Sequence, residues 1–203
     1  MRLSDMPELQ EAKRLLDWAL ERNPGPWGAH CETVARAAHR IASACGMAAE
    51  RCRVMGLVHD IGRFVGRAGV RHVIAGYDLM MEKSWPDAAR ACLTHSFPVR
   101  DLAAYNGEID CTAEECARLT HLLDQAVYDD EVRLIQLCDA ISLPTGVTLM
   151  EKRLMDVGLR HGLSRTTADK WRAFLSIKAH FDALCGQNIY QLFQDEVIEG
   201  IFS

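Results

Sequence analysis

The stretch Gly56–Arg63, with the sequence GLVHDIGR, holds the residues of this chain whose types and spacing are best suited to chemistry. A mostly apolar run leads into His59 and Asp60, and a glycine follows two residues later. An imidazole and a carboxylate are costly to bury unless a partner neutralises them. A divalent metal does this, because both groups are ordinary ligands of zinc, iron and manganese. The pair alone is equally typical of a helix end with a satisfied core histidine.

Four other residues with metal-binding side chains lie at helix ends or inside apolar helical patterns of separate segments, namely His30, His72, His95 and Asp139. Asp139 is the clearest candidate, because it interrupts the apolar run 134–141 and buried carboxylates are rare unless they are paired or bound to metal. Together the set supplies several neutral nitrogens, one carboxylate to bridge and another to complete the shell. A site with two metals needs such donors.

Each of these histidines also has an ordinary structural interpretation. His30, in the first turn of a helix, is by itself more typical of a solvated side chain. For His72, a solvated side chain is as good an interpretation as a metal ligand. His95 lies at a helix C-terminus, where the helix dipole by itself favours a histidine. The metal hypothesis therefore depends on the whole set. The other histidines are assigned to surface or packing roles, and they are His39, His121, His161 and His180.

Helices must position these residues, because apolar residues recur at helical spacing through most of the chain. Asp5 is a candidate cap of the first helix, and Thr112 with Glu115 forms a capping-box pattern further on. The segment 61–70 contains three glycines and is expected to be a loop. The expected helices cover residues 7–22, 27–44, 47–59, 71–83, 87–94, 112–125, 129–142, 148–161 and 166–184, with a last helical piece through 197.

The chain shows no repeat, no low-complexity tract and no convincing strand pattern. We therefore expect an all-α, single-domain helical bundle of about nine helices over residues 1–203. The motifs occupy a core of about 27–144. The N-terminal helix 7–22 and additional C-terminal helices within 147–200 are expected to pack on this core.

The composition is that of a globular protein. Of the 203 residues, 49% are hydrophobic, a fraction that is enough for a sizeable core. The charged fraction of 25% is ordinary for a globular protein. The net charge is -5 and the basic residues are scattered, so neither nucleic acid nor an anionic membrane is expected as a partner. The start of the sequence lacks the apolar core of a secretory signal, and no apolar run is long enough to span a membrane. A cytoplasmic protein is expected.

Eight cysteines are more than average, and their spacing guides their interpretation. No Cys-x-x-Cys pair occurs, and a disulfide framework is not expected in a chain of this size without a secretory signal. Most of them lie inside apolar helical patterns, where a free cysteine acts as a small hydrophobic residue. These cysteines are Cys31, Cys45, Cys52, Cys92 and Cys138.

In its order of histidines and aspartates the chain resembles the HD-domain metal-dependent phosphohydrolase superfamily. HDIGR, beginning at His59, is similar to the motif that names the family, and LTHS, containing His95, is similar to a histidine segment of its two-metal members. His72 with Gly76 is similar to their second-metal histidine. The resemblance covers about Trp27–Pro144. It implies one metal held by His30, His59, Asp60 and Asp139, and a second, bridged by Asp60, held by His72 and His95.

The pattern resembles the dinuclear branch of that family, which includes symmetrical dinucleotide tetraphosphatases, cyclic dinucleotide phosphodiesterases and a few iron oxygenases. The sequence departs from the pattern of that branch in two respects. His72 follows Asp60 by only twelve residues, a shorter gap than in many two-metal members. The GYP element of the enzymes that cleave cyclic di-GMP is absent, which disfavours that substrate.

The resemblance implies a phosphohydrolase in which one or two divalent ions (Fe, Mn, Ni or Zn) activate a water that attacks a phosphomonoester, phosphodiester or pyrophosphate. The partner would be a small phosphorylated substrate such as a nucleotide, and a homodimer stays open. Asp60 and His59 would be catalytic together with Arg63, whose guanidinium suits phosphate, although a solvated loop arginine is the plain alternative. The other candidate substrate contacts are Arg67, Arg71, Thr94, Arg100 and Ser142.

Two alternative functions use the same residues. A dinuclear-iron oxygenase would bind metal through the same ligand set. A metal- or nucleotide-binding sensor would fill the site without turnover.

Overall fold

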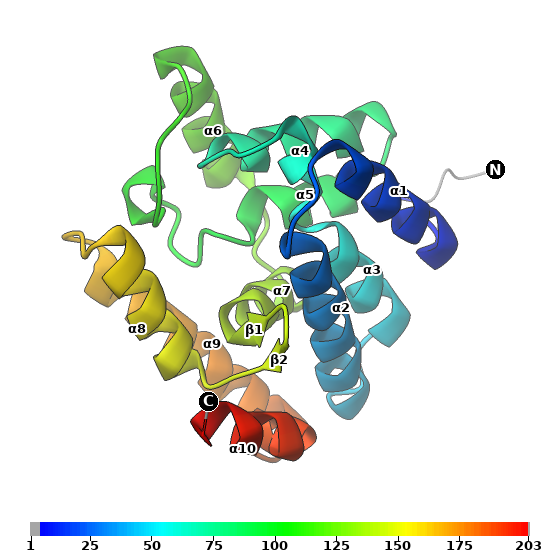
Figure 1. The fold of residues 1–203 in the computed structure, drawn as a ribbon, viewed down its shortest axis with the longest axis vertical. Helices are drawn as coiled ribbons and strands as arrows, with labels where there is room; N and C mark the ends of the chain where they lie inside the picture. The colour runs from blue at the N-terminus through cyan, green and yellow to red at the C-terminus, as the bar shows by residue number, and fades with distance from the viewer. Residues whose placement is uncertain (1–4, 203) are drawn as a thin grey trace.

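The computed structural model describes residues 5–202, so the predictions that concern residues 1–4 and 203 lie outside the described part. This part is all-α, as expected, with ten α-helices, three 3₁₀ helices and one two-stranded ribbon (Figure 1). The elements are α1 (Leu9–Arg22), α2 (Trp27–Ala44), α3 (Ala49–Val58), η1 (Ile61–Val65), α4 (Arg71–Glu82), α5 (Pro86–Thr94), η2 (Leu102–Ala104), α6 (Ala113–Gln125), α7 (Asp130–Ile141), β1 (Ser142–Leu143), β2 (Gly146–Val147), α8 (Met150–His161), α9 (Thr167–Cys185), η3 (Ile189–Phe193) and α10 (Gln194–Phe202).

Helix α7 is the centre of the bundle. It packs against α2, α3, α5, α8 and α9, and eight of its twelve residues are buried. A helix that is apolar on nearly all sides must lie inside the protein, which explains why Asp139 occurs in an apolar run. In Figure 1, α8, α9 and α10 lie together on one side of α7, and α1 lies on the opposite side.

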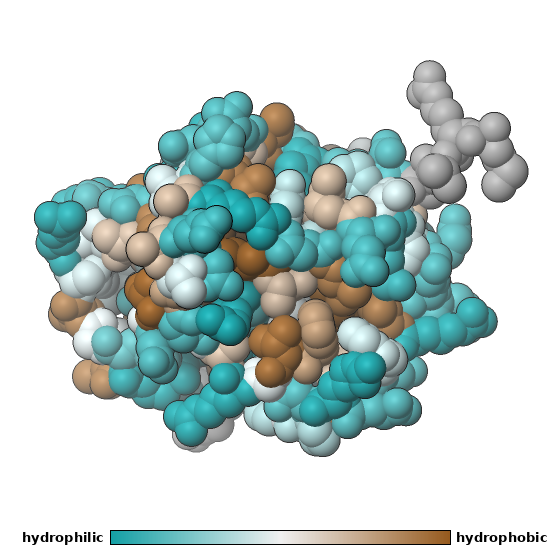
Figure 2. Space-filling model, turned by 90° about the horizontal axis from the view of Figure 1, so that it is seen from above, coloured by the Kyte–Doolittle hydropathy of each residue, from teal (hydrophilic) through white to brown (hydrophobic). Residues whose placement is uncertain are grey.

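One continuous cluster of buried side chains runs from Leu16 in α1 to Val197 in α10. A smaller cluster joins α4, α5 and α6, with Phe97 fully buried in it. On the face shown in Figure 2, hydrophilic side chains cover most of the surface and apolar ones appear in scattered areas between them. Among the described helices, none combines the length and the apolar character needed to cross a bilayer.

Several local expectations need correction. The segment expected as a loop from residue 61 begins with the 3₁₀ helix η1. Asp5 does not cap α1, which begins after Glu8 without a side-chain cap, whereas the capping box of Thr112 and Glu115 is present. The strands β1 and β2 were not expected, because two residues each are too few to show a pattern. The final helix extends beyond Val197 to Phe202.

A disulfide joins Cys45, at the end of α2, to Cys185, the last residue of α9. The expectation that Cys45 acts as a free small hydrophobic residue is therefore wrong. The partners are separated by 140 residues in the chain, and no local pattern shows that two such helix ends meet. The six other cysteines are free thiols, and four of them are buried: Cys31, Cys52, Cys92 and Cys138.

Candidate metal centre

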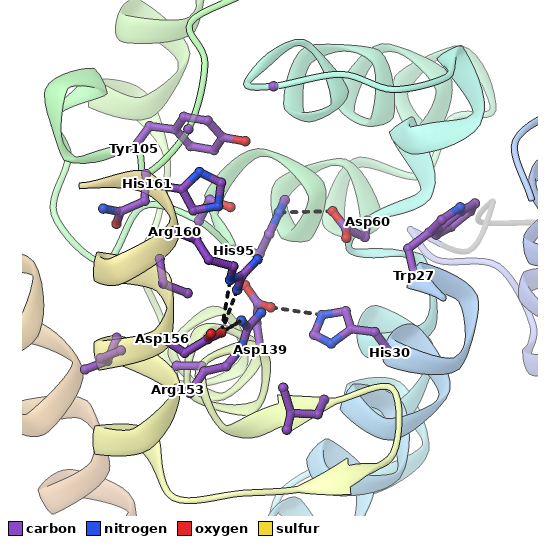
Figure 3. A pocket seen from close by; sticks show the side chains of 18 of the residues that line it. Trp27, His30, Asp60, His95, Tyr105, Asp139, Arg153, Asp156, Arg160 and His161 are labelled. Carbon is purple, nitrogen blue, oxygen red and sulfur yellow. Dashed lines mark hydrogen bonds and ion pairs between the residues drawn. The ribbon is translucent and has the colours of Figure 1, made fainter. Parts of the chain in front are cut away.

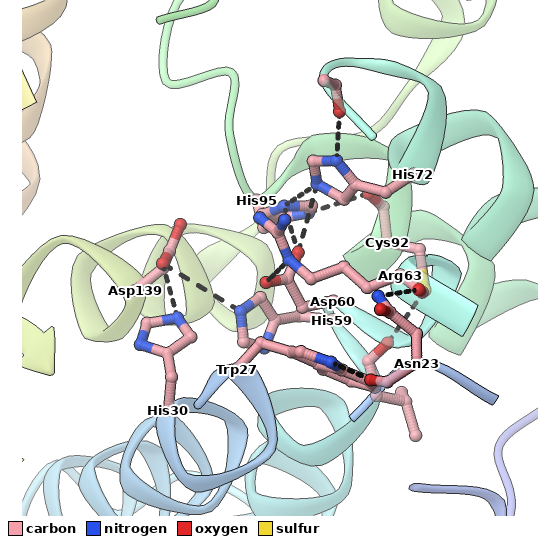
Figure 4. A network of polar contacts seen from close by, with 12 residues as sticks. Asn23, Trp27, His30, His59, Asp60, Arg63, His72, Cys92, His95 and Asp139 are labelled. Carbon is pink, nitrogen blue, oxygen red and sulfur yellow. Dashed lines mark hydrogen bonds and ion pairs between the residues drawn. The ribbon is translucent and has the colours of Figure 1, made fainter. Parts of the chain in front are cut away.

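Six side chains from five separate segments converge in the middle of the fold (Figure 4). His30 comes from the first turns of α2, and Asp139 from the last turn of α7. His59 ends α3 and Asp60 precedes η1. The set is completed by His72 in the first turn of α4 and His95 at the end of α5.

Glycines allow the segments that carry these ligands to approach closely. A Cβ on Gly62 would lie 1.9 Å from the carbonyl oxygen of His72, so only glycine lets η1 pack on the first turn of α4. A Cβ on Gly56 would lie 2.7 Å from the Cα of Ala35, which brings α3 against α2. The glycines on either side of HD are therefore required by packing, because they let the segments that carry these histidines approach closely.

The segment after α5 is held in place by α7. Gln136 is fully buried, and its side-chain amide donates hydrogen bonds to the carbonyls of Thr94 (2.8 Å) and Phe97 (3.0 Å). These two carbonyls flank His95 in the sequence. Gln136 thus couples the helix that carries Asp139 to the backbone that carries His95.

The side chains form two overlapping groups of potential ligand atoms. In the first, Nε2 of His30 lies 3.0 Å and Nε2 of His59 4.0 Å from Oδ1 of Asp139. The ligand atoms of His30, His59 and Asp60 also lie within 4.8 Å of one another. In the second, Oδ1 of Asp60 lies 3.1 Å from Nε2 of His72 and 3.5 Å from Nε2 of His95. Asp60 belongs to both groups, as a bridging carboxylate would.

The backbone sets the orientation of three imidazoles. In each, Nδ1 faces the carbonyl oxygen three residues earlier: Gly56 for His59 (2.7 Å), Gly69 for His72 (2.5 Å) and Cys92 for His95 (2.8 Å). A carbonyl only accepts, so each Nδ1 carries the proton and each Nε2 presents a lone pair to the centre.

The centre therefore contains buried acceptors that face one another. Among the described residues, Nε2 of His59 and Oδ1 of Asp60 have no hydrogen-bond partner. A buried polar atom without a partner is costly. A cation would satisfy several of these atoms at once, and imidazole nitrogen with carboxylate oxygen is a suitable donor set for a divalent transition metal. The residues present thus fit a metal site.

The ionisation states agree with metal binding. Burial lowers the pKa of His59 to about 4, so this side chain is neutral near pH 7. Burial opposes ionisation of Asp60, but the Arg63 guanidinium and His72 hold its pKa well below the ordinary value. Burial likewise opposes ionisation of Asp139, and its hydrogen bond with His30 outweighs this and lowers the pKa. Metals bind neutral imidazole and ionised carboxylate.

His72 and His95 differ in their response to the same surroundings. Burial lowers the pKa of His72. Burial also disfavours a charged His95, but the interaction of its imidazole with the nearby Asp60 carboxylate outweighs this and raises the pKa. In the absence of metal, a proton on His95 would be the cation that this group of acceptors attracts.

A cavity of about 940 Å³ opens onto the centre (Figure 3). The motif-bearing segments contribute His30, Asp60, His95 and Asp139 to its wall, whereas His59 and His72 are buried and do not line it. The opposite wall is formed by α8 and α9, which contribute Arg153, Asp156, Arg160, His161 and Lys170.

Two of the six candidate substrate contacts line this cavity, namely Arg63 and Arg67. Nε of Arg63 donates to Oδ2 of Asp60 at 2.5 Å. This leaves Oδ1 of the carboxylate for the histidine side of the centre.

The structure places the other four candidates away from the cavity wall. Arg71 is held by the carbonyl of Asp110 and pairs with Glu115. Arg100 stacks on Tyr128. The buried hydroxyl of Thr94 donates to the carbonyl of Arg90. Ser142 is fully buried, and within the described residues its hydroxyl has no partner.

The cavity-facing residues of α8 and α9 were not predicted from the sequence to belong to the site. His161, which was assigned to a surface or packing role, lines the cavity. A signal for Lys170 does exist, because it shares a helical stripe with Phe174, Ile177 and Phe181, all of which are buried. A lysine on an apolar stripe is unusual and could have been noticed.

The comparisons with known proteins can now be added to this geometry. The model of the HD-domain family matches residues 27–143. Comparisons with curated proteins and with solved structures gave no match. The matched segment spans more than half of the chain, from the helix that carries His30 to the residues just after Asp139. This chain therefore belongs to the HD-domain family.

Proposed function

We propose that this protein is a metal-dependent phosphohydrolase that acts on a nucleotide or a related small phosphorylated compound. The observation that carries the proposal is the convergence of buried, unpartnered ligand atoms at one side of a large cavity, with Arg63 beside them. A volume of about 940 Å³ is in the upper part of the range for small-molecule sites. A nucleotide fits such a volume.

In this proposal the first metal is held by His30, His59, Asp60 and Asp139, and the second by Asp60, His72 and His95. A divalent ion in this site would lower the pKa of a water molecule and polarise phosphoryl oxygens. Asp60 has the central role, because it is the one residue common to both ligand groups.

Arg63 is suited to holding the phosphoryl group. Its Nε is fixed by Asp60, and in the described part of the chain no hydrogen bond engages its terminal Nη groups. It is partly exposed to the cavity, with 32% of its side-chain surface accessible. The Nη donors can therefore reach phosphoryl oxygens, and they would stabilise the negative charge that develops as phosphorus is attacked.

The proposal includes a cytoplasmic location, and the six free cysteines among the eight in the sequence support it. The Cys45–Cys185 disulfide counts against it, because such bonds are rare in the reducing cytosol. Titration of free thiols in protein taken directly from cells would decide between a cytoplasmic location and an oxidising compartment. A count of eight free thiols would support the cytoplasm, and a count of six would support an oxidising compartment.

Elemental analysis of the purified protein, combined with a screen of phosphomonoesters, phosphodiesters and phosphoanhydrides, tests the function. The expected result is one or two divalent ions per chain and metal-dependent phosphate release. Two irons with oxygen-dependent turnover would overturn the proposal in favour of an oxygenase. Tight nucleotide binding without any turnover would overturn it in favour of a sensor.

A further inference from the structure

The wall of the cavity opposite the metal centre carries an excess of positive charge. It contains Arg153 and Arg160 from α8 and Lys170 from α9, with Asp156 as the neighbouring acid (Figure 3). Asp156 pairs with both arginines, at 3.5 Å from Arg153 and 2.8 Å from Arg160. One carboxylate shared by two guanidiniums leaves one positive charge uncompensated, and Lys170 adds another.

Lys170 is the most unusual member of this wall. It is 8% exposed, and its ammonium donates to the carbonyl oxygen of Ala104 at 2.9 Å. No ion pair joins it to an acid in the described part of the chain. A buried ammonium that has only a carbonyl as its partner is poorly compensated. Burial lowers its pKa to about 8, and the attraction of the Asp139 carboxylate offsets only part of this effect.

Arg153 provides a second, independent observation. Its Nε is buried and has no hydrogen-bond partner among the described residues, although the side chain lines the cavity. Figure 3 shows Arg153, Asp156 and Arg160 extending from α8 toward the side where His30 and Asp139 lie. Arg153, with an unpaired donor, and Lys170, with no ion pair among the described residues, thus line the same cavity.

We propose that Arg153 and Lys170 form a second anion subsite, which binds a further phosphate group of the substrate while the first phosphate lies at the metal centre. This inference rests on the proposed function and narrows its substrate class to compounds with two separate phosphate groups or a polyphosphate chain. Both residues lie outside the segment that matches the family, so the subsite is a property of this chain's own C-terminal helices.

A structural role for Lys170 is the competing explanation. Through Ala104 it holds η2 against α9, and that role alone would affect folding without affecting the choice between ligands. Lys178 offers a matched control on the same helix. It is equally buried at 8%, but it pairs with Asp182 and does not line the cavity.

Calorimetric titration of the metal-loaded protein with AMP, ADP and adenosine 3′,5′-bisphosphate tests the subsite. At least one of the two compounds with a second phosphate should bind about tenfold or more tightly than AMP, as one charge-assisted hydrogen bond provides. Lys170→Gln and Arg153→Gln should each remove most of this preference and leave AMP binding within about twofold. Lys178→Gln should retain it, and Lys170→Arg should keep most of it.

Two results overturn the inference: a wild-type protein that does not prefer either compound over AMP, and a preference that survives both glutamine variants. If Lys170→Gln does not fold, Arg153→Gln and Lys170→Arg decide the question. Repeating the titration without metal measures the preference for a second phosphate without the metal centre, and the hydrolysis screen tests the phosphohydrolase separately. A preference that depends on Lys170, without hydrolysis of any phosphate compound, would disprove only the phosphohydrolase. Hydrolysis without such a preference would disprove only the subsite.

Discussion

Nε2 of His72 and Nε2 of His95 face each other at 3.2 Å, with both Nδ1 atoms directed at backbone carbonyls. Neither nitrogen can donate to the other in the neutral state, so the contact brings two lone pairs together. Asp60 adds a carboxylate oxygen 3.1 Å from His72. A cation between these atoms turns a repulsive arrangement into a favourable one. This geometry supports a second metal position despite the short chain segment between Asp60 and His72.

The first prediction concerns the carboxylate that both ligand groups share. Asp60→Asn should remove the bound metal and lower the rate of phosphate release by about 100-fold or more, because even residues that only support metal ligands cost 10–100-fold. Metal content by elemental analysis and rate should fall together. Asp156→Asn, which changes an acid of the opposite wall, should keep its metal. Full metal content in Asp60→Asn would refute the bridging role.

The second prediction separates substrate binding from metal binding. Arg63→Gln should raise KM or lower kcat/KM by about tenfold or more, because a charge-assisted hydrogen bond to phosphate is lost. Its metal content should stay that of the wild type. Arg172→Gln, at an exposed arginine paired with Asp169, is the control and should leave both measurements unchanged. If Arg63→Gln loses metal, the arginine supports the ligand shell instead of the substrate.

The third prediction concerns the pH dependence of stability in metal-free protein. The pKa of His59 is about 4 when folded, below the ordinary value of 6.5, so the unfolded chain binds more protons between these values. The free energy of unfolding should therefore fall as pH decreases from 6.5 to 4, by about 3 kcal/mol from this residue.

Denaturant unfolding at a series of pH values measures this slope. His59→Gln should flatten it, since glutamine does not titrate. His39→Gln changes a half-exposed histidine outside the centre and serves as the control. An unchanged slope in His59→Gln would show that His59 is not held neutral by burial.

The fourth prediction concerns the covalent link between α2 and α9. Reduction of Cys45–Cys185, or Cys185→Ser, should lower the free energy of unfolding by about 2–4 kcal/mol, because the bond closes a long loop in the unfolded chain. Cys116→Ser, at a free and half-buried cysteine, should have little effect. Equal stability of wild-type protein with and without reductant would mean that the disulfide does not form.

The sequence by itself determined the helical class and the order of the ligand-type residues. Helical periodicity is local, so α2 could be predicted with the same bounds that the structure shows. The apolar run around Asp139 marked that residue as buried, and the HD motif identified His59 and Asp60 as its candidate partners. The structure places these three residues together.

The tertiary structure alone decided which distant residues meet. The pairing of Cys45 with Cys185 and the placement of α8 and α9 across the cavity from Asp60 depend on packing between segments far apart in the chain. The carbonyls of Gly56, Gly69 and Cys92 orient the imidazoles, and no residue type reveals such contacts. Local spacing fixes which face of a helix a side chain occupies, whereas only the packed fold fixes what that face meets.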